Sequence, residues 1–149
     1  MRVTRYGEAG FEFHGKVPGT AMTVAFELYG QPFTALNGGP VFRFNEAVSL
    51  QVLCGDQAEV DHYWARLGEG GAPQAQQCGW LKDRYGLSWQ VVPEVLLEML
   101  LAEDQAAVQR ATQAMLQMKK LDITALQRAF SANRRHEKAA LRQAVRLRC

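Results

Sequence analysis

Apolar and polar residues alternate over 22–28, which predicts a strand with one buried face, because successive side chains of a strand point to opposite faces. The apolar face of this strand carries Met22, Val24, Phe26 and Leu28. Shorter strands are expected over 2–8 and 33–36, with a glycine-rich loop over 10–19 and a breaker at 37–40. The first third of the chain is therefore predicted to be a meander of about three strands.

A second alternating run, over 47–53, predicts another strand. Its two faces carry Val48, Leu50 and Val52 on one side and Ser49, Gln51 and Leu53 on the other. Asp56 and Glu59 then form a capping-box-like pair that predicts the start of a helix. The inward face of this helix is expected to consist of Val60, Tyr63, Trp64 and Leu67.

Aromatic and β-preferring residues over 80–82 and 87–92 flank Asp83–Gly86, which favours a β-hairpin. If Asp83 pairs with Gly86, Trp80 lies opposite Trp89 on a face that a helix covers. The other face then carries Leu81, Ser88 and Gln90. The strand over 47–53, the helix, a possible short strand and this hairpin together predict a βαβββ unit.

The last third of the chain has helical periodicity. Pro93 can occupy the first turn of a short helix, while Asp104 and Asp122 are expected to cap two more. The inward residues of these helices are predicted to be Val95, Leu96, Met99 and Leu100, then Val108, Ala111, Met115 and Met118, then Leu126, Ala129 and Phe130. The fold class expected from the whole pattern is α+β.

Composition places the chain among soluble globular proteins. The 149 residues suit one domain, expected over 1–130, followed by a basic tail over 131–149 with a weak helical pattern. The sequence shows no pattern of a signal peptide or of a membrane span, so we expect a cytoplasmic protein without a membrane partner. The three cysteines lack CxxC spacing and are expected to be reduced thiols. Nucleic acid is not an expected partner, because only Phe130 interleaves with the basic residues.

Catalytic motifs are not evident. The histidines His14, His62 and His136 lack metal-binding spacing and are interpreted as surface residues, and no serine has an identifiable base. Cys54 precedes a helix N-terminus, which can lower a thiol pKa, although a packed small hydrophobic residue is the favoured interpretation.

Three segments resemble one family. LNGGPVFRFNEAVSLQV (36–52), QCGWLKDRYGLSWQVVP (77–93) and MLQMKKLDITAL (115–126) are similar to the PhnB-like branch of the vicinal oxygen chelate superfamily, with glyoxalase I, bleomycin-resistance proteins and extradiol dioxygenases. The resemblance covers roughly 3–130. It implies paired βαβββ modules that form a curved mixed sheet, a homodimer, and a site in the concave face.

Two departures from the family pattern shape the expected function. The first strand and helix of module one have no counterpart before Met1, so the apolar face of the strand over 22–28 is expected to need cover from the C-terminal helices or a second subunit. Metal-dependent members place His or Glu where this chain has Ala47, and Glu where it has Gln90. Neither residue supplies the expected ligand, so no metal and no cofactor are expected.

We therefore expect a metal-independent protein that binds a small organic molecule, with no catalytic residues assigned. The predicted binding wall consists of Ser49, Gln51, Leu81, Ser88 and Gln90. The alternatives are a metal-dependent lyase or dioxygenase, the demethylubiquinone methyltransferase for which some such proteins are named, and a non-catalytic assembly module. A methyltransferase would be expected to have a glycine-rich loop opening a helix, whereas Asn37–Pro40 joins two predicted strands.

Overall fold

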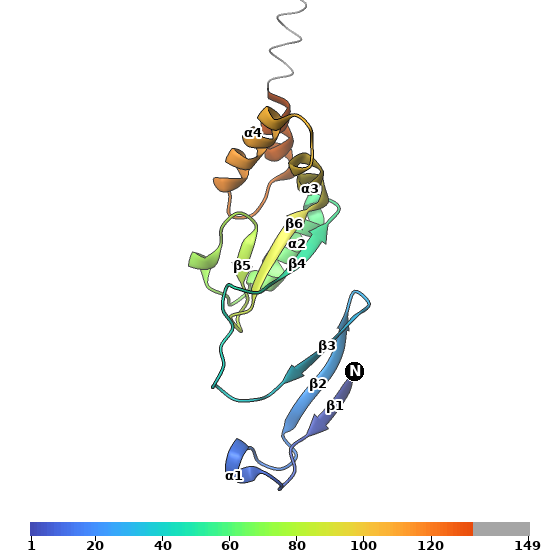
Figure 1. The fold of residues 1–149 in the computed structure, drawn as a ribbon, viewed down its shortest axis with the longest axis vertical. Coiled ribbons are helices and arrows are strands. Elements are labelled where there is room, and N and C mark those ends of the chain that lie inside the picture. Colours follow the sequence, from blue (N-terminus) through green and yellow to red (C-terminus); the bar gives the residue numbers. More distant parts are fainter. Residues whose placement is uncertain (133–149) are drawn as a thin grey trace, which may run out of the picture. The chain divides into compact units, whose positions relative to one another are not determined.

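The computed structural model describes residues 1–132, so the predicted tail beyond them lies outside the described residues. The chain divides into two compact units, Met1–Arg43 and Phe44–Cys149 (Figure 1). None of the described helices is long and apolar enough to cross a membrane.

The first unit is an antiparallel meander. Its strands β1 (Arg2–Arg5), β2 (Ala21–Leu28) and β3 (Gln31–Leu36) pair in the order β1-β2-β3, as the alternation predicts. Tyr29 and Gly30 form the β2–β3 turn with φ of 50° and 78°, the left-handed conformation of a two-residue hairpin loop. The loop over 10–19 contains one helical turn, α1 (Phe11–His14), which the sequence analysis did not predict.

One face of this meander is apolar. Phe26 and Phe33 lie opposite each other on β2 and β3 with ring centroids 5.6 Å apart, and Val3 of β1 lies opposite Val24. No residue in 1–43 is buried. The apolar face of the predicted strand therefore forms as expected, and in the described residues of this unit no helix of more than one turn accompanies it.

The second unit begins with a β-α-β-β arrangement. Its elements are β4 (Ser49–Cys54), α2 (Gln57–Gly68), the short 3₁₀ helix η1 (Pro73–Ala75), β5 (Trp80–Lys82) and β6 (Ser88–Pro93). The sheet has the order β4-β6-β5, with β4 parallel and β5 antiparallel to β6. The α+β class is confirmed, and the described strands form two three-stranded sheets.

The predicted register of the β5–β6 hairpin is wrong by one residue. Trp80 lies opposite Gln90, and Leu81 lies opposite Trp89. The reason is the turn: Asp83 pairs with Leu87, and the Asp83 N–H donates to the Leu87 carbonyl at 3.0 Å. The three-residue loop between them ends at Gly86, whose φ of 85° is left-handed, as in a type I turn followed by a G1 bulge.

The possible extra strand of the βαβββ unit is reduced to one bridge, between Gln77 and Trp80. Cys78 and Gly79 form a tight turn between them with φ of 52° and 84°. The N–H groups of this turn donate to the carbonyls of Met118 and Lys119, both at 2.8 Å. The edge where a fourth strand was expected is therefore bonded to the segment that follows α4.

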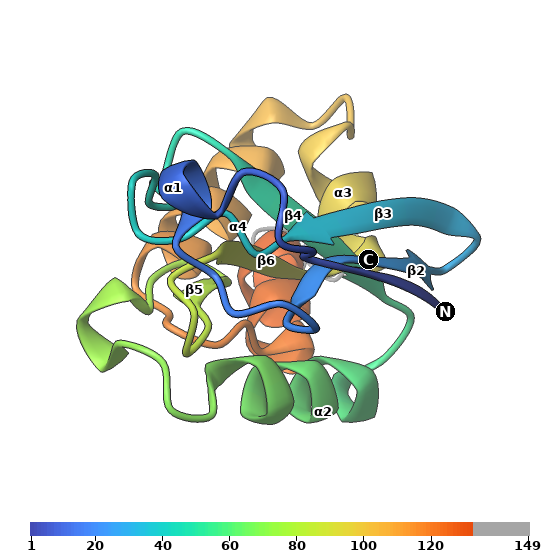
Figure 2. The ribbon, with the colours of Figure 1, turned by 90° about the horizontal axis from the view of Figure 1, so that it is seen from below.

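Helix α2 covers one face of the sheet β4-β6-β5 (Figure 2). Asp56 caps it as predicted, with Oδ1 accepting from the Glu59 N–H at 2.9 Å. The core beneath the helix consists of Cys54, Val60, Leu81 and Val91, with Val52, Trp64, Leu67 and Trp89 packed against it. Tyr63, predicted to face inward, is 38% exposed and lies outside this core.

The C-terminal helices form a second core. They are α3 (Glu94–Leu100), α4 (Gln105–Leu116) and a helix described over 123–132. The buried residues of this core are Val92, Leu96, Met99, Ala111, Leu121 and Leu126. Asp104 and Asp122 cap their helices as predicted, accepting from Ala107 and Ala125.

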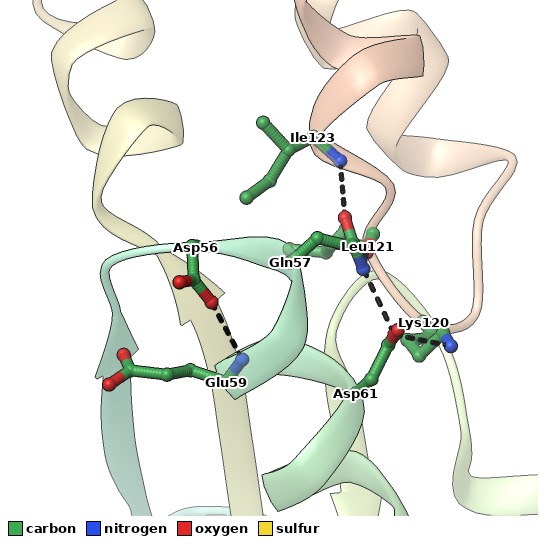
Figure 3. Close-up of polar contacts among 7 residues, drawn as sticks. All are labelled: Asp56, Gln57, Glu59, Asp61, Lys120, Leu121 and Ile123. Atoms are coloured by element: carbon green, nitrogen blue, oxygen red, sulfur yellow. Dashed lines mark hydrogen bonds and ion pairs between the residues drawn. The ribbon is translucent and has the colours of Figure 1, made fainter.

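Gln57 connects α2 to the start of the last helix (Figure 3). Its Nε2 donates to the Leu121 carbonyl at 3.2 Å and to Asp61 Oδ1 at 3.1 Å, while its Oε1 accepts from the Ile123 N–H at 2.9 Å. Lys120 pairs with the same Asp61 oxygen at 2.6 Å. One side-chain amide thus ties the two cores of the second unit together.

Candidate functional site

The face of the sheet β4-β6-β5 that lies opposite α2 is polar over part of its length, before Leu53 and Val92. Strand register arranges six of its side chains in two rows across the three strands. The first row is Ser49, Ser88 and Lys82, and the second row is Gln51, Gln90 and Trp80. We call these six residues the polar face. Four of the five predicted wall residues, Ser49, Gln51, Ser88 and Gln90, are thereby brought together.

Leu81 does not belong to this wall. It is 1% exposed and packs in the core beneath α2, because the corrected hairpin register reverses the direction of every β5 side chain. The same shift moves Trp80 from the predicted helix-facing core to the polar face. It also adds Lys82, a cation that the sequence analysis did not include. A three-residue loop ending in glycine was the available signal for this register.

One hydrogen bond links the two rows of the polar face. Gln90 Nε2 donates to Ser49 Oγ at 2.8 Å, so the Ser49 hydroxyl hydrogen is free to donate elsewhere. Ser88 is 1% exposed, and its hydroxyl has no hydrogen-bond partner among the described residues. An unsatisfied buried hydroxyl costs about 1–3 kcal/mol, so the position of Ser88 calls for a partner.

Lys82 forms an ion pair with Glu46 of the segment before β4. The hydrogen bond from the Lys82 ammonium lowers the pKa of the Glu46 carboxyl below its usual value. The Lys82 side chain is 23% exposed and that of Glu46 is 69% exposed. Because β6 lies between β5 and β4, this ion pair spans the central strand near the row of Ser88.

The two positions that the sequence analysis compared with metal ligands, Ala47 and Gln90, do not lie opposite each other, because Gln90 pairs with Gln51. Ala47 precedes β4, with its N–H bonded to Asn45 Oδ1 at 3.0 Å, and Gln90 lies in the middle of β6. Among residues 1–132, no group of three or more His, Cys, Asp or Glu side chains is placed to hold a metal ion. Gln90 uses its amide nitrogen on Ser49.

The remaining candidate groups lie outside the polar face. Burial, and to a smaller extent the carboxylates of Glu59, Asp56 and Glu94, together raise the pKa of the Cys54 thiol to about 11. The packed-residue interpretation of Cys54 is confirmed. His14 packs on Tyr6 with ring centroids 4.4 Å apart, and its Nδ1 accepts from the Lys16 N–H. This histidine has a local structural contact in the first unit.

A shallow groove of about 350 Å³ lies between α3 and the last helix. Its lining residues are Val95, Glu98, Met99, Ala102, Gln127, Phe130 and Ser131. None of them belongs to the polar face. The sequence analysis assigned Val95, Met99 and Phe130 to the helical core, and it did not predict the groove.

The fold and the polar face define an α+β protein with an antiparallel meander, a β-α-β-β unit and C-terminal helices. The family model described as 3-demethylubiquinone-9 3-methyltransferase matches residues 1–92, more than half of the chain. The chain belongs to this family, in agreement with the PhnB-like resemblance of its sequence.

A solved structure supports the same assignment. The PhnB protein from Bacillus cereus, described as a 3-demethylubiquinone-9 3-methyltransferase, is 31% identical to this chain. The match covers 62% of this chain and 77% of that chain, with a TM-score of 0.52. No curated protein matches the chain significantly.

Proposed function

We propose that the protein binds a small organic molecule on the polar face without a resident metal ion, as a PhnB-like member of the vicinal oxygen chelate type. The observation that carries the proposal is the buried Ser88 hydroxyl without a partner, in a contiguous group with Ser49 and Gln90. Hydrogen-bonding groups of this kind on a partly apolar wall are typical of small-molecule sites. Trp80 supplies apolar area next to Gln90.

Metal independence rests on the residues at two positions. Ala47 has no ligating side chain, and the amide of Gln90 is a weak ligand compared with a carboxylate. Metal analysis of protein purified without chelator tests this part of the proposal. A stoichiometric divalent ion that is lost in Gln90→Ala would show that the polar face is a metal site.

Methyl transfer is the second candidate function, and the description of the family favours it. It requires that the protein bind S-adenosylmethionine. Calorimetric titration with S-adenosylmethionine distinguishes the two candidates. Saturable binding together with methylation of a demethylubiquinone analogue would replace ligand binding by methyl transfer as the function.

Thermal-shift screening against small metabolites tests the binding site directly. We expect hits that raise the unfolding temperature of the wild type and whose binding Gln90→Ala weakens about tenfold or more, since the substitution removes an amide from the wall and leaves the partly buried Ser49 hydroxyl without its partner. Gln113→Ala, which removes an exposed glutamine side chain from α4, is the matched control. Hits that respond equally to both substitutions would show that the ligand binds elsewhere.

A further inference from the structure

The first row of the polar face presents three hydrogen-bond donors to a ligand, one of which is a cation. The Ser49 oxygen already accepts from Gln90, so its O–H remains to donate. The Ser88 hydroxyl is buried without a partner, and Lys82 across the strand is a cation without acceptor capacity. Two hydroxyl donors in one row with a cation complement an acceptor that carries negative charge, which is the chemistry of a carboxylate.

The ion pair between Lys82 and Glu46 shows that a carboxylate can reach the cation of this row. Glu46 reaches Lys82 from the segment before β4, and the pair therefore spans β6 near Ser88. The Glu46 side chain is 69% exposed, so its displacement into water would cost little. Its low pKa keeps it ionised at neutral pH, so it competes with any other anion for Lys82.

From this arrangement we propose that the ligand of the polar face is a small organic monocarboxylate, which displaces Glu46 from Lys82 and accepts from Ser88. This inference rests on the proposed function and specifies its ligand class. Lys82 is the one cation in the row, and it matches the single negative charge of a monocarboxylate. The Glu46 carboxylate acts as a tethered competitor, which occupies Lys82 until the ligand replaces it.

The second row fixes the size of the ligand. Rows two residues apart on a strand are separated by about 6.6 Å, so an acid group at Ser88 places the body of the ligand beside Trp80 and Gln90. The indole of Trp80 is a half-buried apolar surface that suits a flat or aliphatic body. A carboxylate with a body of about the length of benzoate or hexanoate spans both rows.

The test is titration of the full-length protein with matched acid and amide pairs, followed by calorimetry and by NMR shifts of the polar-face amides. The pairs are benzoate with benzamide and hexanoate with hexanamide, and inorganic phosphate is the anion without a carboxylate. We expect at least one acid to bind about tenfold or more tightly than its amide and to shift the amide signals of Lys82 and Ser88. Phosphate binding as tightly as the acids would overturn the carboxylate assignment.

Two substitutions should act in opposite directions. Lys82→Met is expected to abolish the preference for the acid over the amide, whereas Glu46→Gln, which removes the competing charge, is expected to strengthen acid binding several-fold. The control is Lys120→Met, which breaks the exposed ion pair with Asp61 away from the polar face and should leave acid binding unchanged. Amide binding that is retained in Lys82→Met excludes misfolding as the reason for its lost preference for the acid.

The outcomes separate this inference from the proposed function. Acids and amides that bind equally well, with affinity still dependent on Gln90, would overturn the carboxylate assignment and leave ligand binding in place. Acid binding that is the same in Lys82→Met and the wild type would overturn it as well. If no member of either pair binds at the polar face, while neutral metabolites do, the carboxylate inference fails alone; if nothing binds there, both fail.

Discussion

At the scale of single residues, burial determines the chemistry of Cys54. The thiol is fully buried beneath α2, and its pKa is raised to about 11 by burial and by nearby carboxylates. Because the folded pKa lies above the unfolded one, the thiol stabilises the fold below about pH 9 and this contribution is lost as pH rises through 11. A nucleophilic role would need the opposite shift.

Cys54 should therefore resist alkylation in the native protein. At pH 8 we expect iodoacetamide to label it about a hundredfold or more slowly than an unfolded thiol, because two pKa units reduce the thiolate fraction by that factor. Peptide mapping by mass spectrometry measures the labelling, and the same protein in urea is the control. Rapid labelling of native Cys54 would contradict the burial described here.

Gly79 is a second residue whose role depends on a close contact. Its φ is 84°, and a Cβ at this position would lie 2.9 Å from Leu121 Cδ1 and 3.0 Å from the Val91 carbonyl oxygen. We expect Gly79→Ala to lower the free energy of unfolding by about 2–4 kcal/mol, from the left-handed backbone and the overlap together. Urea denaturation measures the change.

The matched control is Gly86→Ala. Gly86 has nearly the same φ, 85°, but nothing lies within 4 Å of an added Cβ. Only the backbone cost of about 1–2 kcal/mol is expected there. Equal losses in the two variants would show that the packing of Leu121 on the turn contributes nothing.

At the scale of elements, local periodicity predicted most of the second unit. Asp56 and Glu59 marked the start of α2, and the alternation around Ser49 assigned the faces of β4 correctly. The register of the hairpin was mispredicted because a three-residue loop and a two-residue loop place the same strands one residue apart. Leu81 and Trp80 exchanged faces for this reason alone.

Contacts between distant elements left no signal in the sequence. Gln57 lies on α2 and bonds the backbone at Leu121 and Ile123, which no periodicity indicates. No sequence pattern indicates the hydrogen bonds from the Cys78–Gly79 turn to the carbonyls after α4 either. A fourth strand was expected where these backbone groups instead bond a C-terminal segment.

Gln57→Ala should weaken the connection between the two cores of the second unit. The substitution leaves the Ile123 N–H and the Leu121 carbonyl without their partner, and we expect a loss of about 1–3 kcal/mol in the free energy of unfolding. Chemical denaturation measures it. Lys120→Met is the control, since it breaks only the exposed ion pair with Asp61 and should have a small effect.

The same control variant tests the pH dependence of this contact. Hydrogen bonds from Lys120 and Gln57 lower the pKa of the Asp61 carboxyl. The ionised Asp61 therefore stabilises the fold above the usual aspartate pKa, and this stabilisation is lost as pH falls through the lowered pKa of Asp61. In Lys120→Met, NMR titration should show the Asp61 pKa moving up toward its ordinary value. An unchanged titration would mean that Lys120 does not pair with Asp61 in solution.

At the scale of the whole molecule, the two units differ in what holds them together. The second unit has two buried clusters, beneath α2 and among the C-terminal helices. Residues 1–43 contain no buried side chain, and the apolar face of β2 with Phe26 and Phe33 is only half-buried. An apolar sheet face of this kind is stabilised when another surface packs on it.

Hydrogen exchange on the full chain distinguishes a sheet that stands alone from one that a second copy covers. At low protein concentration we expect the amides of β2 to exchange at least a hundredfold faster than those of β6, because both strands are central in their sheets but only β6 carries buried residues such as Val91 and Val92. If two copies cover each other's apolar faces, protection of β2 should rise with concentration while that of β6 stays constant, since association stabilises only the surface that it buries.

Phe26→Lys should abolish that rise, and Thr34→Lys on the other face of the same sheet is the matched control. Protection of β2 equal to that of β6 at every concentration would mean that the first sheet is covered within a single chain.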